Sequence, residues 1–193
     1  MTGKGEDHAM NKKEFLPGTL MRCPEGTDPA TLLDGLFIAG GLVLSQVSAL
    51  TGLEGYTVQN WVQRGFVTPT VGKRYSMDQF CRLVTINLLK DSLSLGQIAG
   101  LLSAINGKLD DESDDMIDDA LLYIYFVRIC FRMEGFDREE LQRVAKEVTA
   151  DFAEPKEGAA GRLREVLGVM YAAYLSSVYR RTAEEMLNEI SPE

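Results

Sequence analysis

Helix-starting signals, each followed by apolar residues at helical spacing, recur along this chain and favour a largely helical fold. Asp28 precedes Pro29, a pair that is typical of a helix N-terminus. Capping boxes, in which a serine is followed three residues later by a glutamine, begin at Ser76 and Ser94. After Ser94, apolar residues recur every three or four positions up to Ile105, which is the period of one helix face. The sequence therefore predicts that helices form the core.

Caps together with glycine and proline breaks set the expected helix boundaries. In the first half, caps at residues 28, 45, 57, 76 and 94 begin helices that end near residues 40, 52, 65, 90 and 106. In the second half, helices are expected near residues 116–133, 138–152 and 161–190. Strand-like patterns are confined to residues 66–70 and 73–76, which could pair as a minimal β wing. The expected fold class is all-α with this one β element.

Composition changes along the chain indicate three segments. Residues 1–26 are interrupted by prolines and glycines near their end, which is typical of a flexible leader. Residues 108–119 are mostly acidic and mark a natural boundary. We therefore expect a leader over residues 1–26, a first domain over residues 27–107 and an acidic C-terminal helical bundle over residues 108–193.

The scarcity of reactive side chains removes several function classes. His8 is the single histidine, so histidine-based triads and histidine-ligated zinc are not expected. Cys23, Cys81 and Cys130 are far apart and have no metal-binding spacing. The acidic run at residues 110–115 lacks the glycine that an EF-hand calcium loop needs at its sixth position. We expect no metal, no cofactor and no enzymatic activity.

Apolar runs in this chain are short. None approaches the roughly 20 residues that a membrane helix needs, and the longest, residues 36–44, is interrupted by two glycines. The N-terminus has no apolar segment of the kind that begins a signal peptide. Together with cysteines that fit reduced thiols, these features predict a cytoplasmic protein with no membrane partner.

Charge is distributed unevenly. The net charge is −9, which taken alone argues against nucleic-acid binding. Residues 1–100 nevertheless hold nine basic and nine acidic residues, whereas residues 101–193 hold eleven and twenty. Between residues 60 and 90, five basic residues stand against one acidic residue, a balance of +4. Because salt limits the reach of a charge to about 8–10 Å, this local balance can support DNA binding despite the acidic second half.

The helix expected after Thr57 has one apolar face and one hydrogen-bonding face. Val58, Trp61 and Val62 share one side at helical spacing, and Trp61 is expected in the core. The opposite side carries Gln59, Asn60, Gln63 and Arg64. Amide side chains can pair with adenine and arginine with guanine in the major groove of DNA. The alternative is that these groups form an ordinary solvated face.

A short basic turn follows that helix. Lys73 and Arg74 come directly after Gly72, which predicts a tight turn that projects both cations from the surface. Cations on such a turn can contact phosphates and fix the register of a protein on DNA. An ordinary charged loop is the alternative. Tyr75 is expected to pack the turn against the domain, with its hydroxyl within reach of a phosphate.

Large aromatic side chains gather in the second half of the chain. They include Tyr123, Tyr125, Phe126, Tyr171, Tyr174 and Tyr179. Their helical spacing favours the core of a bundle. The same residues could also line a subunit interface or a ligand pocket, where aromatic residues are enriched.

The residues between 44 and 98 resemble the DNA-binding domain of MerR-type regulators. The resemblance rests on Leu44-Ser45-Gln46-Val47, Leu50-Thr51-Gly52, Thr57-Val58, Gly65-Phe66-Val67, Pro69, Arg74-Tyr75-Ser76 and Ser94-Leu95-Gly96-Gln97-Ile98. In that family a helix-turn-helix is followed by a wing and two packing helices. Residues 86–102 are similar to a bacterial family of uncharacterised MerR-like proteins, a domain of unknown function. The resemblance implies a MerR-like winged helix-turn-helix.

The chain also departs from the MerR pattern. MerR proteins usually place Arg and Tyr in the recognition helix where this chain has Gln59 and Asn60. The wing is short, with five residues between Pro69 and Tyr75. The long dimerising helix of that family does not follow directly after Ile105, so a promoter-twisting mechanism is not implied.

The sequence therefore predicts specific double-stranded DNA binding and transcriptional regulation. The expected DNA-contacting residues are Thr57, Gln59, Asn60, Gln63, Arg64, Lys73, Arg74 and Tyr75. One such module makes few base contacts, so we expect a homodimer joined through the C-terminal helices. The alternatives are a winged-helix module that binds proteins instead of DNA, and a regulator whose C-terminal helices sense an apolar ligand. The sequence does not identify an effector.

Overall fold

Helices dominate the computed structural model, which describes residues 14–106 and 116–190. The described helices are α2 (Pro29–Phe37), α3 (Leu44–Thr51), α4 (Gly55–Gln63), α5 (Met77–Leu89), α6 (Leu95–Asn106), α7 (Asp119–Arg132), α8 (Arg138–Val148) and α9 (Ala159–Ile190). Between extended segments of the described residues, pairing is limited to isolated bridges. The predicted all-α class is confirmed.

Three helix starts are held by side-chain caps, and two of these are the predicted capping boxes. Ser76 Oγ accepts a hydrogen bond from the Gln79 amide at 3.2 Å, and Gln79 Oε1 accepts one from the Ser76 amide at 2.9 Å. The second capping box, at Ser94, has the same two bonds. Asp137 Oδ1 accepts from the amide three residues later at 2.7 Å. Asp28 precedes α2 but makes no cap bond, because its carboxylate binds Arg128 of α7.

The predicted caps at Ser45 and Thr57 are wrong. Val43 is the N-cap of α3, and Glu54 is the N-cap of α4. Gly52 ends α3 in the left-handed region, with φ 72°, as expected. Residues 52–54 form the whole turn between α3 and α4. This short turn is held in place because Leu53 is buried and its amide donates to the Thr51 hydroxyl. Helix α4 therefore begins two residues earlier than its predicted cap.

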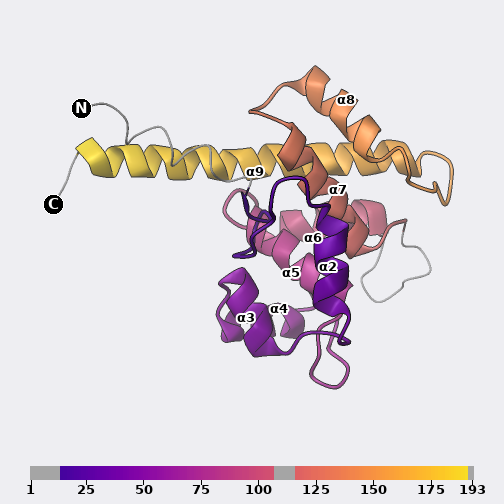
Figure 1. Cartoon of the computed structure of the whole chain (residues 1–193), viewed down its shortest axis with the longest axis vertical. Helices are drawn as coiled ribbons and strands as arrows, with labels where there is room; N and C mark the ends of the chain where they lie inside the picture. The colour runs from indigo at the N-terminus through magenta and orange to yellow at the C-terminus, as the bar shows by residue number, and fades with distance from the viewer. Residues whose placement is uncertain (1–13, 107–115, 191–193) are drawn as a thin grey trace.

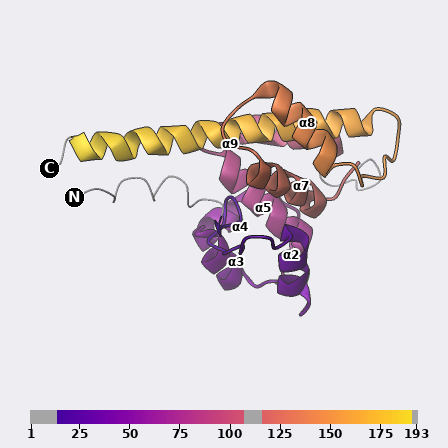
Figure 2. The same cartoon turned by 45° about the horizontal axis from the view of Figure 1, so that its top comes forward.

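Helix α5 lies at the centre of the fold. Nine of its 13 residues are buried, and it contacts α3, α6, α7 and α9. Figures 1 and 2 show α5 between α3 and α4 on one side and the long helix α9 on the other. Buried side chains from residues 16 to 175 belong to one hydrophobic cluster. The predicted boundary at residue 107 lies outside the described residues and stays a prediction, although the core is continuous between the two segments.

The predicted flexible leader is packed from residue 14 onward. Leu16 and Cys23 are buried in the core cluster. The Tyr123 hydroxyl of α7 donates to the Pro17 carbonyl oxygen at 2.7 Å, and Phe15 forms a bridge with Arg22. These apolar groups and a buried hydrogen bond give the segment a fixed place, which its prolines and glycines did not suggest. Residues 1–13 lie outside the described residues.

Aromatic side chains of the second half are mostly core residues, as the simpler interpretation predicts. Tyr123, Tyr125 and Tyr171 are buried. The Tyr171 hydroxyl donates to the Gly135 carbonyl oxygen at 2.9 Å, and the rings of Tyr174 and Phe126 form a T-shaped pair. Burial raises the pKa of Tyr174 to about 12.

No helix among residues 14–106 and 116–190 is long and apolar enough to cross a membrane.

A buried ion pair joins α5 to α7. Arg82 Nη1 lies 3.1 Å from Asp119 Oδ2, and the two side chains are only 9% and 14% exposed. Arg82 Nε also donates to the Phe66 carbonyl oxygen at 2.7 Å. One guanidinium group therefore fixes the segment after α4 and the start of α7 at the same time.

We expect Asp119→Ala to lower the free energy of unfolding by about 3–5 kcal/mol, because it leaves the Arg82 charge buried without a partner. Urea unfolding followed by circular dichroism measures this decrease. The double variant Arg82→Met/Asp119→Leu should recover most of it. As a control, Arg143→Ala breaks an exposed helix pair and should cost less than about 1 kcal/mol. Equal decreases for Asp119→Ala and Arg143→Ala would contradict the role of the buried pair.

Candidate nucleic-acid interface

The orientation of α4 is set by its apolar face. Val58 and Trp61 are buried, and Val62 is half-buried, as the sequence predicts. The Lys90 ammonium of the segment after α5 lies 6.0 Å from the centre of the Trp61 ring. With this side fixed in the core, the opposite side of α4 must face solvent.

The solvent side of α4 carries an unpaired row of amides. Gln59, Asn60 and Gln63 are exposed, and within the described residues their side chains make no hydrogen bond to the protein. Arg64, at the helix end, is also exposed, and its guanidinium lies 5.0 Å from the centre of the Phe66 ring. Four of the predicted contact residues therefore share one accessible face. Their hydrogen-bonding capacity is available to another molecule.

Tyr56 belongs to the same region but was not predicted from the sequence. It is the second residue of α4, and its side chain is 72% exposed. The predicted cap at Thr57 put Tyr56 outside the helix. In the structure Thr57 is instead a half-buried residue of the first turn of α4. The signal that could have found it is Gly52, because a left-handed helix end followed by a short turn brings the next helix start forward.

The segment between α4 and α5, residues 64–76, is referred to below as the bridged loop. Gly72 and Lys73 both have positive φ, 61° and 59°, and the Arg74 amide donates to the Val71 carbonyl oxygen at 3.2 Å. Positive φ at both central residues is the requirement of a tight type I′ turn. Lys73 and Arg74 are exposed at this turn, as predicted.

The pairing predicted between residues 66–70 and 73–76 is absent from the described structure. Instead, Tyr75 pairs with Leu42 ahead of α3: each amide donates to the other's carbonyl oxygen, at 2.7 and 3.0 Å. The Tyr75 ring is buried, and burial raises the pKa of its hydroxyl. Its expected packing role is confirmed, while its phosphate contact stays a prediction. Because the Tyr75 ring is buried in the core, its backbone pairs with Leu42 and not with residues 66–70 of its own loop.

Arg74 ties the bridged loop to the segment before α3. Its Nη1 donates to the Gly41 carbonyl oxygen at 2.9 Å. Gly41 has φ 87°, and a Cβ there would lie 2.9 Å from the Tyr75 carbonyl oxygen, so only glycine allows this approach. A guanidinium has five N–H donors, so Arg74 keeps donors for another partner.

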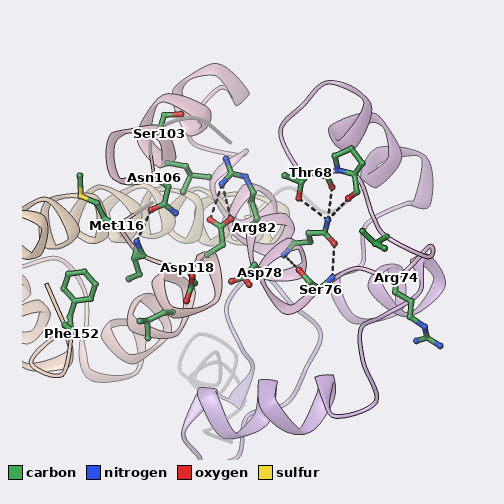
Figure 3. A pocket seen from close by; sticks show the side chains of 18 of the residues that line it. Thr68, Arg74, Ser76, Asp78, Arg82, Ser103, Asn106, Met116, Asp118 and Phe152 are labelled. Atoms are coloured by element: carbon green, nitrogen blue, oxygen red, sulfur yellow. Dashed lines mark hydrogen bonds and ion pairs between the residues drawn. The ribbon is translucent and has the colours of Figure 1, made fainter. Parts of the chain in front are cut away.

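A cleft of about 870 Å³ separates the base of the bridged loop from the C-terminal helices. Figure 3 shows Thr68 and Ser76 on one side of this cleft and Asn106 and Met116 on the other. Gln79 Nε2 donates to the carbonyl oxygens of Thr68 and Pro69, at 3.0 and 3.1 Å. The side chain that completes the α5 capping box thus also holds the base of the bridged loop.

Most polar groups of the cleft bind one another. Asp78 Oδ1 accepts from the Ala120 amide at 3.0 Å, and Asn106 Oδ1 accepts from the Ile117 amide at 3.3 Å. Arg82 is engaged as described above. Within the described part of the chain, no group of three or more His, Cys, Asp or Glu side chains is placed to hold a metal ion. The cleft is therefore a polar joint between α5 and α7, and among the described residues no buried side-chain polar atom lacks a hydrogen-bond partner.

Burial raises the pKa of Asp119 above 3.8, because the loss of hydration outweighs the attraction of Arg82. The folded state therefore binds this proton more tightly than the unfolded state does. Stability contributed by this carboxyl should rise as the pH falls toward the raised pKa. We expect the unfolding free energy of the wild type to increase relative to Asp119→Asn as the pH falls from about 7 to about 4.5. A decrease in the unfolding free energy of the wild type relative to Asp119→Asn would show that the attraction of Arg82 outweighs the loss of hydration.

Comparison with known proteins finds that part of the chain is similar to a domain family whose function is undefined. Residues 42–126 match the model described as "Domain of unknown function (DUF1836)". This span runs from the bridge residue Leu42 through most of α7, so it contains α4, the bridged loop and the Arg82–Asp119 pair. The chain is also 25% identical over 160 residues to the "Uncharacterized protein YkrK" of Bacillus subtilis (strain 168). The aligned part covers 76% of this chain and 69% of that protein. No solved structure matches the chain significantly.

Proposed function

We propose that this protein binds specific sequences of double-stranded DNA and regulates transcription. In this proposal α3 and α4 act as a helix-turn-helix, α4 is the recognition helix and the bridged loop is a short wing of the MerR type. The observation that carries the proposal is the row of exposed, unpaired amides at Gln59, Asn60 and Gln63, together with the basic turn at Lys73 and Arg74 in the loop that follows α4 along the chain. This combination supplies base-reading and phosphate-binding groups on adjacent elements.

Helix α4 would enter the major groove, which is about 12 Å wide and admits an α-helix. Gln59 and Asn60 would each form paired hydrogen bonds with an adenine edge, and Arg64 would donate to guanine or to a phosphate. Tyr56 lies at the exposed start of the same helix, where its hydroxyl can donate to a phosphate. Thr57 stands beside it in the first turn and can make a similar contact.

The bridged loop would bind the DNA backbone next to the groove. Lys73 and Arg74 project from a turn whose geometry is fixed, so their charges occupy defined positions. The tie from Arg74 to Gly41 also holds this turn near the start of α3. Phosphate contacts of this kind orient a protein on the duplex without reading sequence. Tyr75 is buried, so this role rests on the two cations.

A protein-docking surface is the competing function, and one observation favours it. Ile38 and Val71 are among the most exposed large apolar side chains of the described residues, and Val71 stands at the tip of the bridged loop. Apolar groups at such a position suit a protein partner better than a phosphate backbone. In that case the winged-helix form would remain without DNA binding.

We expect the wild-type chain to enrich a motif when bound fragments are selected from a random duplex library. Asn60→Ala should relax the preference at particular base pairs and weaken binding to the motif by about 1–3 kcal/mol, the value of one paired hydrogen-bond contact to a base. Gln142→Ala, an exposed glutamine on α8, is the matched control and should leave the motif unchanged. Weak binding of the wild type that is blind to sequence would overturn this function and leave the docking alternative.

Lys73→Ala and Arg74→Ala should instead weaken binding to all duplexes about equally. A plot of log affinity against log salt has a negative slope. For each phosphate that the variant no longer neutralises, this slope should become less steep by about 0.9. Fluorescence anisotropy at several salt concentrations measures this slope. Lys146→Ala on α8 removes one exposed positive charge far from the bridged loop and should keep the wild-type slope. If Lys73→Ala and Arg74→Ala leave this slope unchanged, the bridged loop is not part of the DNA interface.

A further inference from the structure

The bridged loop keeps its shape without strand pairing. Its first leg, residues 66–70, and its second leg, residues 73–76, stand on either side of the tight turn that begins at Gly72. Within the described residues, no backbone hydrogen bond joins one leg to the other. Pro69 has no N–H group, so the first leg cannot supply a full set of ladder donors. A different connection is needed to keep the two legs in one relative position.

The Gln79 side chain supplies this connection from the first turn of α5. Its Oε1 accepts from the Ser76 amide of the second leg at 2.9 Å. Its Nε2 donates to the carbonyl oxygens of Thr68 and Pro69 on the first leg, at 3.0 and 3.1 Å, and to the Thr68 hydroxyl at 3.1 Å. Figure 3 draws these bonds as dashed lines between Thr68 and Ser76. One side-chain amide thus joins both legs.

Only an uncharged amide meets the demands of both legs. The Ser76 amide is a donor and needs an oxygen opposite it, whereas the carbonyl oxygens of the first leg are acceptors and need an N–H group. An ionised glutamate offers the oxygen but has no hydrogen to donate. A capping box accepts either glutamate or glutamine at this position, so the cap alone does not explain the amide. The bonds to the first leg do.

The second capping box provides an internal comparison. Gln97 Oε1 accepts from the Ser94 amide at 2.9 Å, the same cap bond that Gln79 makes. Gln97 is exposed, and its side-chain nitrogen makes no hydrogen bond within the described residues. The two glutamines therefore share the cap and differ in the bonds to the bridged loop.

We propose that Gln79 takes the place of strand pairing in the bridged loop and is a positioning residue for Lys73 and Arg74. Both cations stand at the turn between the legs that Gln79 joins. Without the amide, the first leg loses its bonds to α5 while the second leg stays paired with Leu42. That the position of the cations matters for DNA rests on the proposed function, whereas the connection between the legs does not.

Gln79→Glu and Gln97→Glu test the connection in the full chain at about pH 8, where a glutamate side chain is ionised. Both variants keep the cap acceptor, but only Gln79→Glu loses donors to the loop. Trypsin cleaves after Lys73 and Arg74 when the loop opens locally. We expect Gln79→Glu to raise the rate of this cleavage roughly tenfold and Gln97→Glu to keep the wild-type rate. Mass spectrometry of the first fragments measures both rates.

Cleavage after Lys156, in the exposed segment before α9, is the internal reference and should keep its rate in both variants. Equal cleavage of the bridged loop in Gln79→Glu and Gln97→Glu would overturn the inference. A rise that cleavage after Lys156 shares would also overturn it, because Gln79 would then stabilise the whole fold and not the loop.

Gln79→Met and Gln97→Met test the positioning role without a change of charge. Both lose the cap acceptor, so the effect of the cap is matched. Gln79→Met should weaken binding to all duplexes severalfold and keep the selected motif, whereas Gln97→Met should bind like the wild type. In a Lys73→Ala/Arg74→Ala background, Gln79→Met should have no further effect, because the groups that it positions are gone. A further loss of the same size there would overturn the positioning role.

The two readouts separate this inference from the proposed function. A wild type that binds no DNA, with a loop that Gln79→Glu opens, would retain the connection and remove the proposed function. DNA binding by the wild type, with loop cleavage that Gln79→Glu leaves unchanged, would do the reverse.

Discussion

The ion pair between Arg82 and Asp119 connects the parts of this fold that matter for its candidate site. Arg82 lies on α5, whose buried surface holds the chain together, and reaches both the carbonyl oxygen of Phe66 and the start of α7. A charge with this little exposure must be fully paired, so neither element can move away from α5 without a large energetic cost. Gln79, also on α5, holds the base of the bridged loop through hydrogen bonds to two of its carbonyl oxygens. The position of the bridged loop thus depends on the core.

This dependence explains how an acidic protein can offer a surface suited to DNA. The excess negative charge belongs to residues 101–193, whereas α4 and the bridged loop carry amides, Lys73 and Arg74. In the proposed function, the acidic helices limit non-specific attraction and specificity comes from α4.

Much of the architecture could be predicted from local signals. The capping boxes at Ser76 and Ser94 form as expected, since both bonds of a capping box join residues only three positions apart. Predictions failed where a distant partner decided the outcome. Asp28 binds Arg128, which is 100 residues away, and Tyr75 pairs with Leu42 instead of with its own loop. Neither partner leaves a signal near the residue concerned.

The sequence by itself determined the helical class, the amphipathic character of α4 and the tight turn at Gly72 and Lys73. Each of these follows from side-chain spacing or backbone preference within a few residues. Only the tertiary structure decided that residues 14–26 pack, that Tyr56 is exposed and that residues 183–190 of α9 stay exposed. Periodicity shows that a helix has an apolar face, but burial depends on which surfaces the rest of the chain brings against it.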